Sequence, residues 1–163
     1  MLFANNGAAA SGVQRYLRQL GSHPGKDANY TIGGNRTMSI EECYQQIGGD
    51  YRQVLSRLMT PKLVVRFIAK FLEDNSFDLL KAALEQGNCK DAFRAAHTLK
   101  GVCQSLGLGN LLSSTQVMTE LLRHQENEIP PQAQACFEDV RRDYDATVAA
   151  IKSFLESCAQ NPV

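Results

Sequence analysis

The sequence lacks an excess of charge of either sign, because its 163 residues carry 17 Lys and Arg side chains and 17 Asp and Glu side chains. A protein that binds nucleic acid by neutralising phosphates needs a basic excess, so we expect no nucleic-acid partner. Long apolar runs are also missing. The longest, 63–72, is interrupted by Arg66 and Lys70, and residues 1–12 have neither a basic start nor an adequate apolar stretch. We therefore expect neither a membrane span nor a secretory signal.

The cysteines show no metal-binding pattern. The five cysteines form no CxxC pair and have no histidine at metal-ligand spacing; they are Cys43, Cys89, Cys103, Cys136 and Cys158. This usage is typical of a reducing compartment, in which most such thiols serve as small buried apolar groups. We expect a cytoplasmic protein with no metal site and no cofactor of its own.

Strand-like alternation is absent, and the composition changes once along the chain. Six of the twelve glycines and only one acidic residue lie in the first 37 residues. This break predicts an N-terminal extension over 1–37, with one short helix candidate at 13–20, followed by a helical domain over 38–163.

Capping residues, prolines and glycines divide the helical domain into segments. Including their caps, the predicted helices run from Ser39 to Gly48, Asp50 to about Met59, Pro61 to Leu72, Asn75 to Gly87, Asn88 to about Leu106, Asn110 to about Gln125, and Pro130 onward. Two of their predicted apolar stripes are Val64, Phe67, Ile68, Phe71 and Leu72, and Leu79, Leu80, Ala83 and Leu84. Short loops between amphipathic helices favour antiparallel neighbours, which predicts an all-α, up-and-down four-helix bundle with extra N-terminal helices.

The segment 90–106 carries the residues with chemical content. On a helical wheel its core stripe is opposite His97 and consists of Ala92, Ala95, Leu99, Val102 and Leu106. His97 therefore points away from the bundle. An exposed imidazole is mostly uncharged and nucleophilic at neutral pH, so this side chain can act as a nucleophile.

The neighbours of this imidazole have physical interpretations of their own. Lys100, one turn on, can offset negative charge on a group that the imidazole carries. Gly101 costs about 1 kcal/mol in a helix interior relative to alanine, so space beside the imidazole matters more here than local helix stability. Gln104 can donate a hydrogen bond to a bound oxygen or a ring nitrogen. Phe93 is a candidate apolar contact and Arg94 a second cation, while no carboxylate on this face would repel an anion.

This pattern resembles a known motif. His97-Thr-Leu-Lys100-Gly101, followed by Leu106-Gly107, is similar to the phosphoacceptor motif of histidine-containing phosphotransfer (HPt) domains in phosphorelays. The resemblance extends more loosely from Ile40 to about Leu122, about half the chain. The family usually has two small residues after the motif glycine, where this chain has Val102 and Cys103, so we expect altered packing with the site retained.

The resemblance implies that His97 is phosphorylated, supported by Lys100 and Gly101. The protein would take a phosphoryl group from an aspartyl phosphate on a response-regulator receiver domain and pass it to another receiver aspartate. The receiver would supply Mg²⁺ and most of the catalytic groups. A hybrid histidine kinase is a further candidate partner. We expect a monomeric phosphoryl carrier that has no ATP site and is not itself an enzyme.

Two interpretations compete with this one: a helical interaction module that binds receivers or kinases without carrying phosphate, and a purely structural bundle. Other chemistries lack their residues, because the chain has no Glu-x-x-His pair for a bundle metal site and no strand before its glycines to form a phosphate loop. Cys103 lies about 120° around the helix from His97, which excludes a thiol–imidazole pair. We interpret His23 and His124 as surface residues.

Overall fold

The protein, seen in a computed structural model, is described over residues 38–125 and 128–160, and all regular structure in these ranges is helical. The predicted helix over 13–20 and His23 lie outside the described residues. None of the described helices is long and apolar enough to cross a bilayer.

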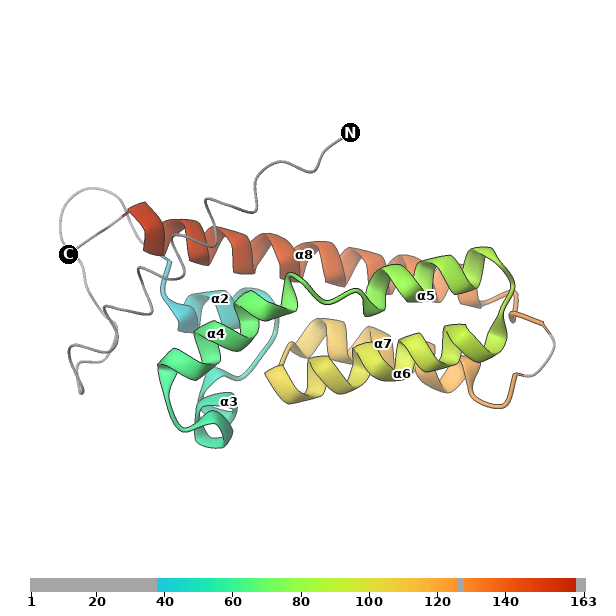
Figure 1. Ribbon diagram of the computed structural model, residues 1–163, viewed down its shortest axis with the longest axis horizontal. Helices are drawn as coiled ribbons and strands as arrows, with labels where there is room; N and C mark the ends of the chain where they lie inside the picture. Colours follow the sequence, from blue (N-terminus) through green and yellow to red (C-terminus); the bar gives the residue numbers. More distant parts are fainter. Residues whose placement is uncertain (1–37, 126–127, 161–163) are drawn as a thin grey trace.

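Four helices form an antiparallel bundle, as predicted: α5 (Ser76–Glu85), α6 (Cys89–Leu106), α7 (Gly109–Leu122) and α8 (Ala133–Gln160) (Figure 1). Successive helices pack side by side, and α8 runs the length of the molecule. Aromatic rings join α5 to α8, because Phe77 stacks on Tyr144 with ring centroids 4.0 Å apart and on Phe137 at 5.5 Å. The up-and-down bundle is confirmed.

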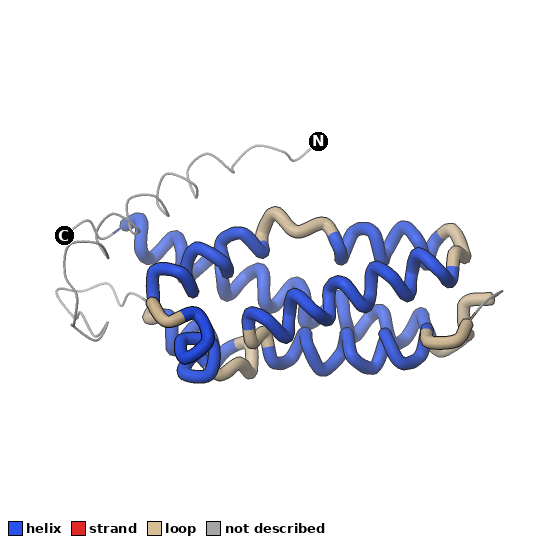
Figure 2. Tube along the Cα trace, turned by 60° about the horizontal axis from the view of Figure 1, so that its bottom comes forward, coloured by secondary structure: helices blue, strands red, loops and turns tan. Residues whose placement is uncertain are grey.

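Three further helices gather at one end of this bundle: α2 (Ile40–Gln46), α3 (Tyr51–Leu58) and α4 (Pro61–Phe71) (Figure 2). Their predicted starts are confirmed. Ser39 and Glu42 form a reciprocal capping box before α2, and the side chain of Asp50 accepts from the backbone N–H of Gln53 at the start of α3. Pro61 occupies the first turn of α4.

Two residues assigned to apolar stripes are in fact exposed. Phe67 of α4 is 43% exposed and Leu79 of α5 is 54% exposed. The buried face of α4 is centred on Val65 and Ile68, and that of α5 runs through Phe77 and Leu80. Each exposed residue stands one position before a buried one, which turns it about 100° around the helix and away from the core. Val102 of α6, assigned to the core stripe, is only partly buried.

The start of α7 also differs from the prediction. Asn110 was expected to cap this helix, but the helix begins one residue earlier, at Gly109, and its N-cap is Leu108, which gives no side-chain hydrogen bond. The backbone N–H of Asn110 instead donates to the carbonyl of Ile47, at 3.0 Å. A contact between distant loops has therefore replaced the local cap.

The connection between α7 and α8 is longer than predicted. The helix α7 ends at Leu122, short of Gln125, because Arg123 is extended and His124 takes a left-handed backbone conformation, with φ of 67°. The helix α8 begins at Ala133 instead of at Pro130, whose carbonyl accepts from the Ala133 amide in the preceding turn.

The core contains four of the five cysteines, as expected; Cys43, Cys89, Cys103 and Cys136 are buried, and Cys158 is half-buried. Burial raises the pKa of the Cys103 thiol to about 12, so this thiol stays protonated at neutral pH. The cysteine nearest the candidate histidine in the sequence of α6 is therefore a packing residue.

A glycine junction holds the extra helices against the end of the bundle. It consists of Gly48 and Gly49, after α2, and Gly107 and Gly109, between α6 and α7. A Cβ atom on Gly109 would stand 1.9 Å from the carbonyl oxygen of Gly48, and one on Gly49 would stand 2.3 Å from that of Gly107. The two loops can approach this closely only because side chains are missing, and the contact fixes where α6 ends.

Candidate functional site

The helix α6 has the bounds that its capping residues predict. The side chain of Asn88 accepts from the backbone N–H of Asp91, at 3.1 Å, and Gly107 closes the helix in a left-handed conformation. The inner face is buried through Ala92, Ala95, Ala96, Leu99, Cys103 and Leu106. Since this face is anchored along the whole helix, the opposite face is held toward solvent.

The predicted site residues lie along this outer face and its margin. His97, Gly101, Gln104 and Arg94 are exposed, and Lys100 and Phe93 are half-buried. The ring of Phe93 lies beside the imidazole of His97, with centroids 6.0 Å apart and planes tilted by 35°. One turn separates these two residues, so a half-buried aromatic ring supports one side of the exposed imidazole.

Gly101 has open space where its side chain would be. Beyond its two chain neighbours and the backbone of its own helix, a Cβ atom built at this position meets no atom of the described residues within 4 Å, and the backbone there is ordinary helix. The protein's own packing therefore does not require glycine at this position. The expected preference for space beside His97 is consistent with a requirement that arises outside the chain.

The neighbouring helix brings a cation to Phe93. The guanidinium carbon of Arg123, which follows α7, lies 5.8 Å from the centre of the Phe93 ring, within the range of a cation–π contact. The sequence interpretation missed this residue, because its place beside Phe93 depends on how α7 packs on α6. Arg94, the cation expected from α6 itself, pairs with Asp91 at 3.4 Å, toward the start of the helix.

A carboxylate on α7 also stands in this neighbourhood. Glu120 accepts two hydrogen bonds of 2.7 Å from Arg123, and these bonds lower the pKa of its carboxyl group, with smaller contributions from the charges of Arg123, Lys100 and His124. The expectation of a site without carboxylates holds for the outer face of α6 alone. The adjacent helix supplies a carboxylate whose charge is already compensated by cations.

Gln104 lies nearer the glycine junction than the imidazole does. Its backbone carbonyl accepts from Arg57 of α3, at 3.1 Å, so an extra helix caps a carbonyl in the last turn of α6. A shallow cleft of about 490 Å³ between the two helices is lined by Arg57, Gln104 and the glycine junction. The added helix α3 thus contacts α6 at its C-terminal end.

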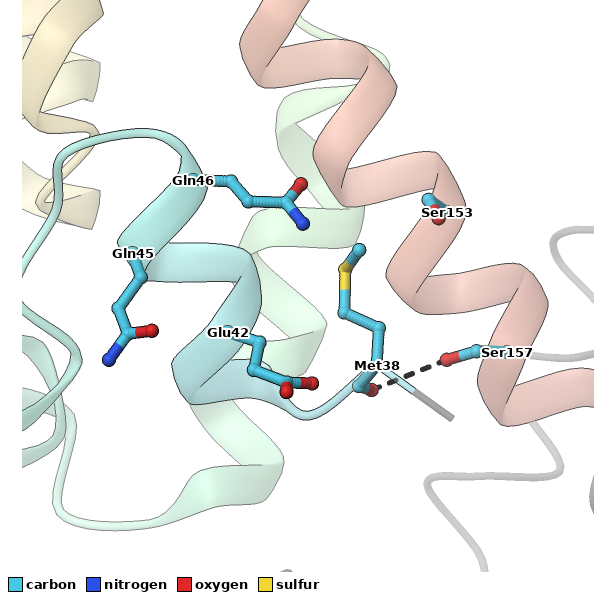
Figure 3. Close-up of a pocket in the computed structure, with 6 residues that line it drawn as sticks. All are labelled: Met38, Glu42, Gln45, Gln46, Ser153 and Ser157. Carbon is cyan, nitrogen blue, oxygen red and sulfur yellow. Dashed lines mark hydrogen bonds between the residues drawn. The ribbon is translucent and has the colours of Figure 1, made fainter. Parts of the chain in front are cut away.

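A second cleft, of about 570 Å³, lies between α2 and the C-terminal part of α8 (Figure 3). Its lining is polar and consists of Met38, Glu42, Gln45, Gln46, Ser153 and Ser157. A hydrogen bond of 3.3 Å from the Ser157 hydroxyl to the Met38 carbonyl bridges its two sides. None of the predicted site residues lines this cleft. The candidate site is an exposed helix face, the kind of surface that another protein can reach.

Over residues 38–125 and 128–160, no group of three or more His, Cys, Asp or Glu side chains could hold a metal ion.

Comparison with known proteins identifies the family. Residues 66–157, more than half of the chain, match the family described as Hpt domain. The chain belongs to the Hpt domain family. No curated protein and no solved structure matches it.

The Hpt match covers the bundle and the C-terminal part of α4. It contains all six residues that the sequence pattern singled out, and it runs beyond Leu122, where the motif resemblance ended, to residue 157. The helices α2 and α3 precede it. Hpt domains act in histidine phosphotransfer within phosphorelays, interact with receiver domains, and carry phosphoryl groups without binding ATP.

Proposed function

We propose that His97 is the phosphoacceptor and that this chain relays a phosphoryl group between aspartates of receiver domains. The observation that supports this proposal is the exposed imidazole of His97 next to Gly101, whose missing side chain leaves open space on a helix anchored along its opposite face. A glycine in that position destabilises the helix without serving the chain's own packing. A docking partner that must approach the imidazole closely accounts for it.

The chemistry follows from the residues. An imidazole nitrogen of His97 attacks the phosphorus of an aspartyl phosphate in line, the N–P bond forms as the O–P bond breaks, and the aspartate leaves as a carboxylate. Transfer onward is the same displacement with the roles exchanged. Because the reaction needs little covalent assistance, positioning and charge stabilisation supply most of the rate.

Lys100 and Gln104 have supporting roles in this proposal. The ammonium of Lys100, one turn from His97, offsets the negative charge of the phosphoryl group, and the Gln104 amide is a hydrogen-bond donor farther along the same face. Phe93 supports the imidazole ring and presents apolar surface to a receiver domain. The receiver contributes Mg²⁺ and the remaining catalytic groups.

The test is phosphorylation followed by site location. We expect the protein, after incubation with a receiver domain phosphorylated by acetyl phosphate, to gain one acid-labile, alkali-stable phosphate, located on His97 by mass spectrometry. His97→Gln should abolish the label. His124→Gln is the matched control, because His124 is also exposed, and this variant should be labelled like the wild type.

Two results would contradict the proposal. Label that persists in His97→Gln would place the phosphate elsewhere. Stable binding of a phosphorylated receiver without any transfer would instead favour the interaction module that carries no phosphate.

A further inference from the structure

Arg123 takes part in a set of contacts that the phosphoacceptor motif does not account for. Its guanidinium lies 5.8 Å from the centre of the Phe93 ring and donates two hydrogen bonds of 2.7 Å to Glu120. Phe93 in turn lies 6.0 Å from the imidazole of His97, centre to centre. The two ring distances bound the separation between guanidinium and imidazole at about 12 Å. A flexible arginine side chain and an outward-pointing phosphoryl group can close much of such a gap.

Arg123 can leave its ion pair with Glu120 for a stronger acceptor. The side chains of Arg123 and Glu120 are 40% and 53% exposed, and an ion pair with this much water around it contributes little net free energy. A phosphoryl group carries more negative charge than a carboxylate and presents three oxygens to the same planar, bidentate donor. Once His97 is phosphorylated, the phosphoryl group is therefore the stronger acceptor for this guanidinium.

The other arginine near the motif is placed less well. Arg94 is 75% exposed and pairs with Asp91, on the side of α6 toward its start, whereas the cation–π contact with Phe93 is made by Arg123. Lys100 supplies charge from α6, but an ammonium is a point charge that lacks a bidentate face. Of the described side chains that contact Phe93 or His97, Arg123 alone offers that geometry.

We propose that Arg123 binds the phosphoryl group of phosphorylated His97 and that it pairs with Glu120 while His97 is unphosphorylated. In the free protein Glu120 and Phe93 hold its guanidinium against the Phe93 ring, within about 12 Å of the imidazole, and it moves onto the phosphoryl group when His97 carries one. This inference rests on the proposed phosphorylation of His97 and names the residue that stabilises the phosphorylated state.

The experiment measures the position of the phosphotransfer equilibrium between a phosphorylated receiver domain and the full chain. We expect Arg123→Ala to lower the equilibrium fraction of phosphorylated His97 about fivefold, as the loss of one exposed charge-assisted contact predicts. Arg123→Lys should recover part of this loss, because the charge remains and the bidentate face does not. Glu120→Gln should raise the fraction, because it releases Arg123.

A direct readout accompanies the equilibrium. The Nε–H resonance of Arg123 in ¹H–¹⁵N NMR spectra should shift when His97 is phosphorylated, and it should not shift when His97→Gln is treated in the same way. Arg142→Ala is the control, since Arg142 also forms an exposed ion pair, with Asp139 on α8, and this variant should transfer like the wild type. Circular dichroism of each variant checks that the bundle is intact.

The outcomes separate the two hypotheses. Suppose that wild-type His97 is phosphorylated, that Arg123→Ala has the same phosphotransfer equilibrium, and that the Arg123 resonance does not shift. The inference about Arg123 is then overturned and the phosphoacceptor proposal stands. If the wild type does not load at all, the phosphoacceptor proposal fails and this inference fails with it.

Discussion

Gly101 lies in the middle of α6 and Gly107 directly follows its last residue, and the fold requires only one of these two glycines. At the end, Gly107 has φ of 63°, and a Cβ atom there would stand 2.4 Å from a methyl group of Val54. In the middle, Gly101 has helical backbone and open space around it. Gly107 is required by this chain's own structure. Gly101 is a stability cost that the chain's own structure does not explain.

This difference is a way to separate folding from function within a single helix. A residue that the fold requires meets other atoms of the chain, so a substitution there destabilises the protein. A residue kept for a partner meets nothing in the free protein, so a substitution there leaves stability unchanged or raises it and lowers activity. On this criterion the junction is structural, and open space at Gly101 supports our proposal that the surface around His97 serves a partner.

A large expected effect on stability tests the structural half of the comparison. Gly109→Ala should destabilise the protein by about 3 kcal/mol, because its Cβ atom would stand 1.9 Å from the Gly48 carbonyl and the two loops must separate. Urea unfolding measures the change. Ser113→Ala, on an exposed position of α7, is the control and should change stability little. A loss below about 0.5 kcal/mol would mean that the loops do not need this close approach.

The next effect tests the assignment of the two faces of α6. Leu99→Ala should destabilise by about 2–5 kcal/mol, because Leu99 is fully buried and its truncation leaves a cavity. Its exposed neighbour Thr98 is the matched site, and Thr98→Ala should change the free energy of unfolding by less than about 0.5 kcal/mol. Equal effects at the two positions in urea titrations would mean that α6 is rotated and that His97 is not on the outer face.

The sequence predicted those parts of the fold that depend on local chemistry. Asn88 and Gly107 define both ends of α6 because a cap acts within a few residues of the helix end. The exposure of His97 followed from the period of the helix and the buried stripe opposite it. The same reasoning failed at Asn110, where the backbone bonds to Ile47, a residue distant in sequence.

The rest of the site depends on how helices pack, and a helix period cannot give that. Glu120 lies near the end of α7, and Arg123 directly follows that helix. The position of Arg123 beside Phe93, and of Glu120 near Lys100, depends on how α7 is rotated against α6. Likewise, periodicity alone could not decide between the adjacent apolar residues Phe67 and Ile68 for the core of α4. Local motifs thus suffice to propose His97 as the nucleophile, whereas its neighbours across helices require the structure.

The smallest expected change in stability tests the functional half of the comparison. Gly101→Ala should stabilise the protein by about 1 kcal/mol in urea titrations, because alanine favours the helix and its methyl group meets no described atom outside the local helix backbone. The same methyl group would enter the space that a receiver domain needs, so transfer from a phosphorylated receiver should slow about tenfold, the effect of roughly 1.4 kcal/mol on the barrier. Loading by phosphoramidate, a small donor, should change far less. Ser105→Ala, one turn on, is the control for both measurements. A stabilised variant that accepts phosphate from the receiver at the wild-type rate would show that the open space at Gly101 does not serve docking.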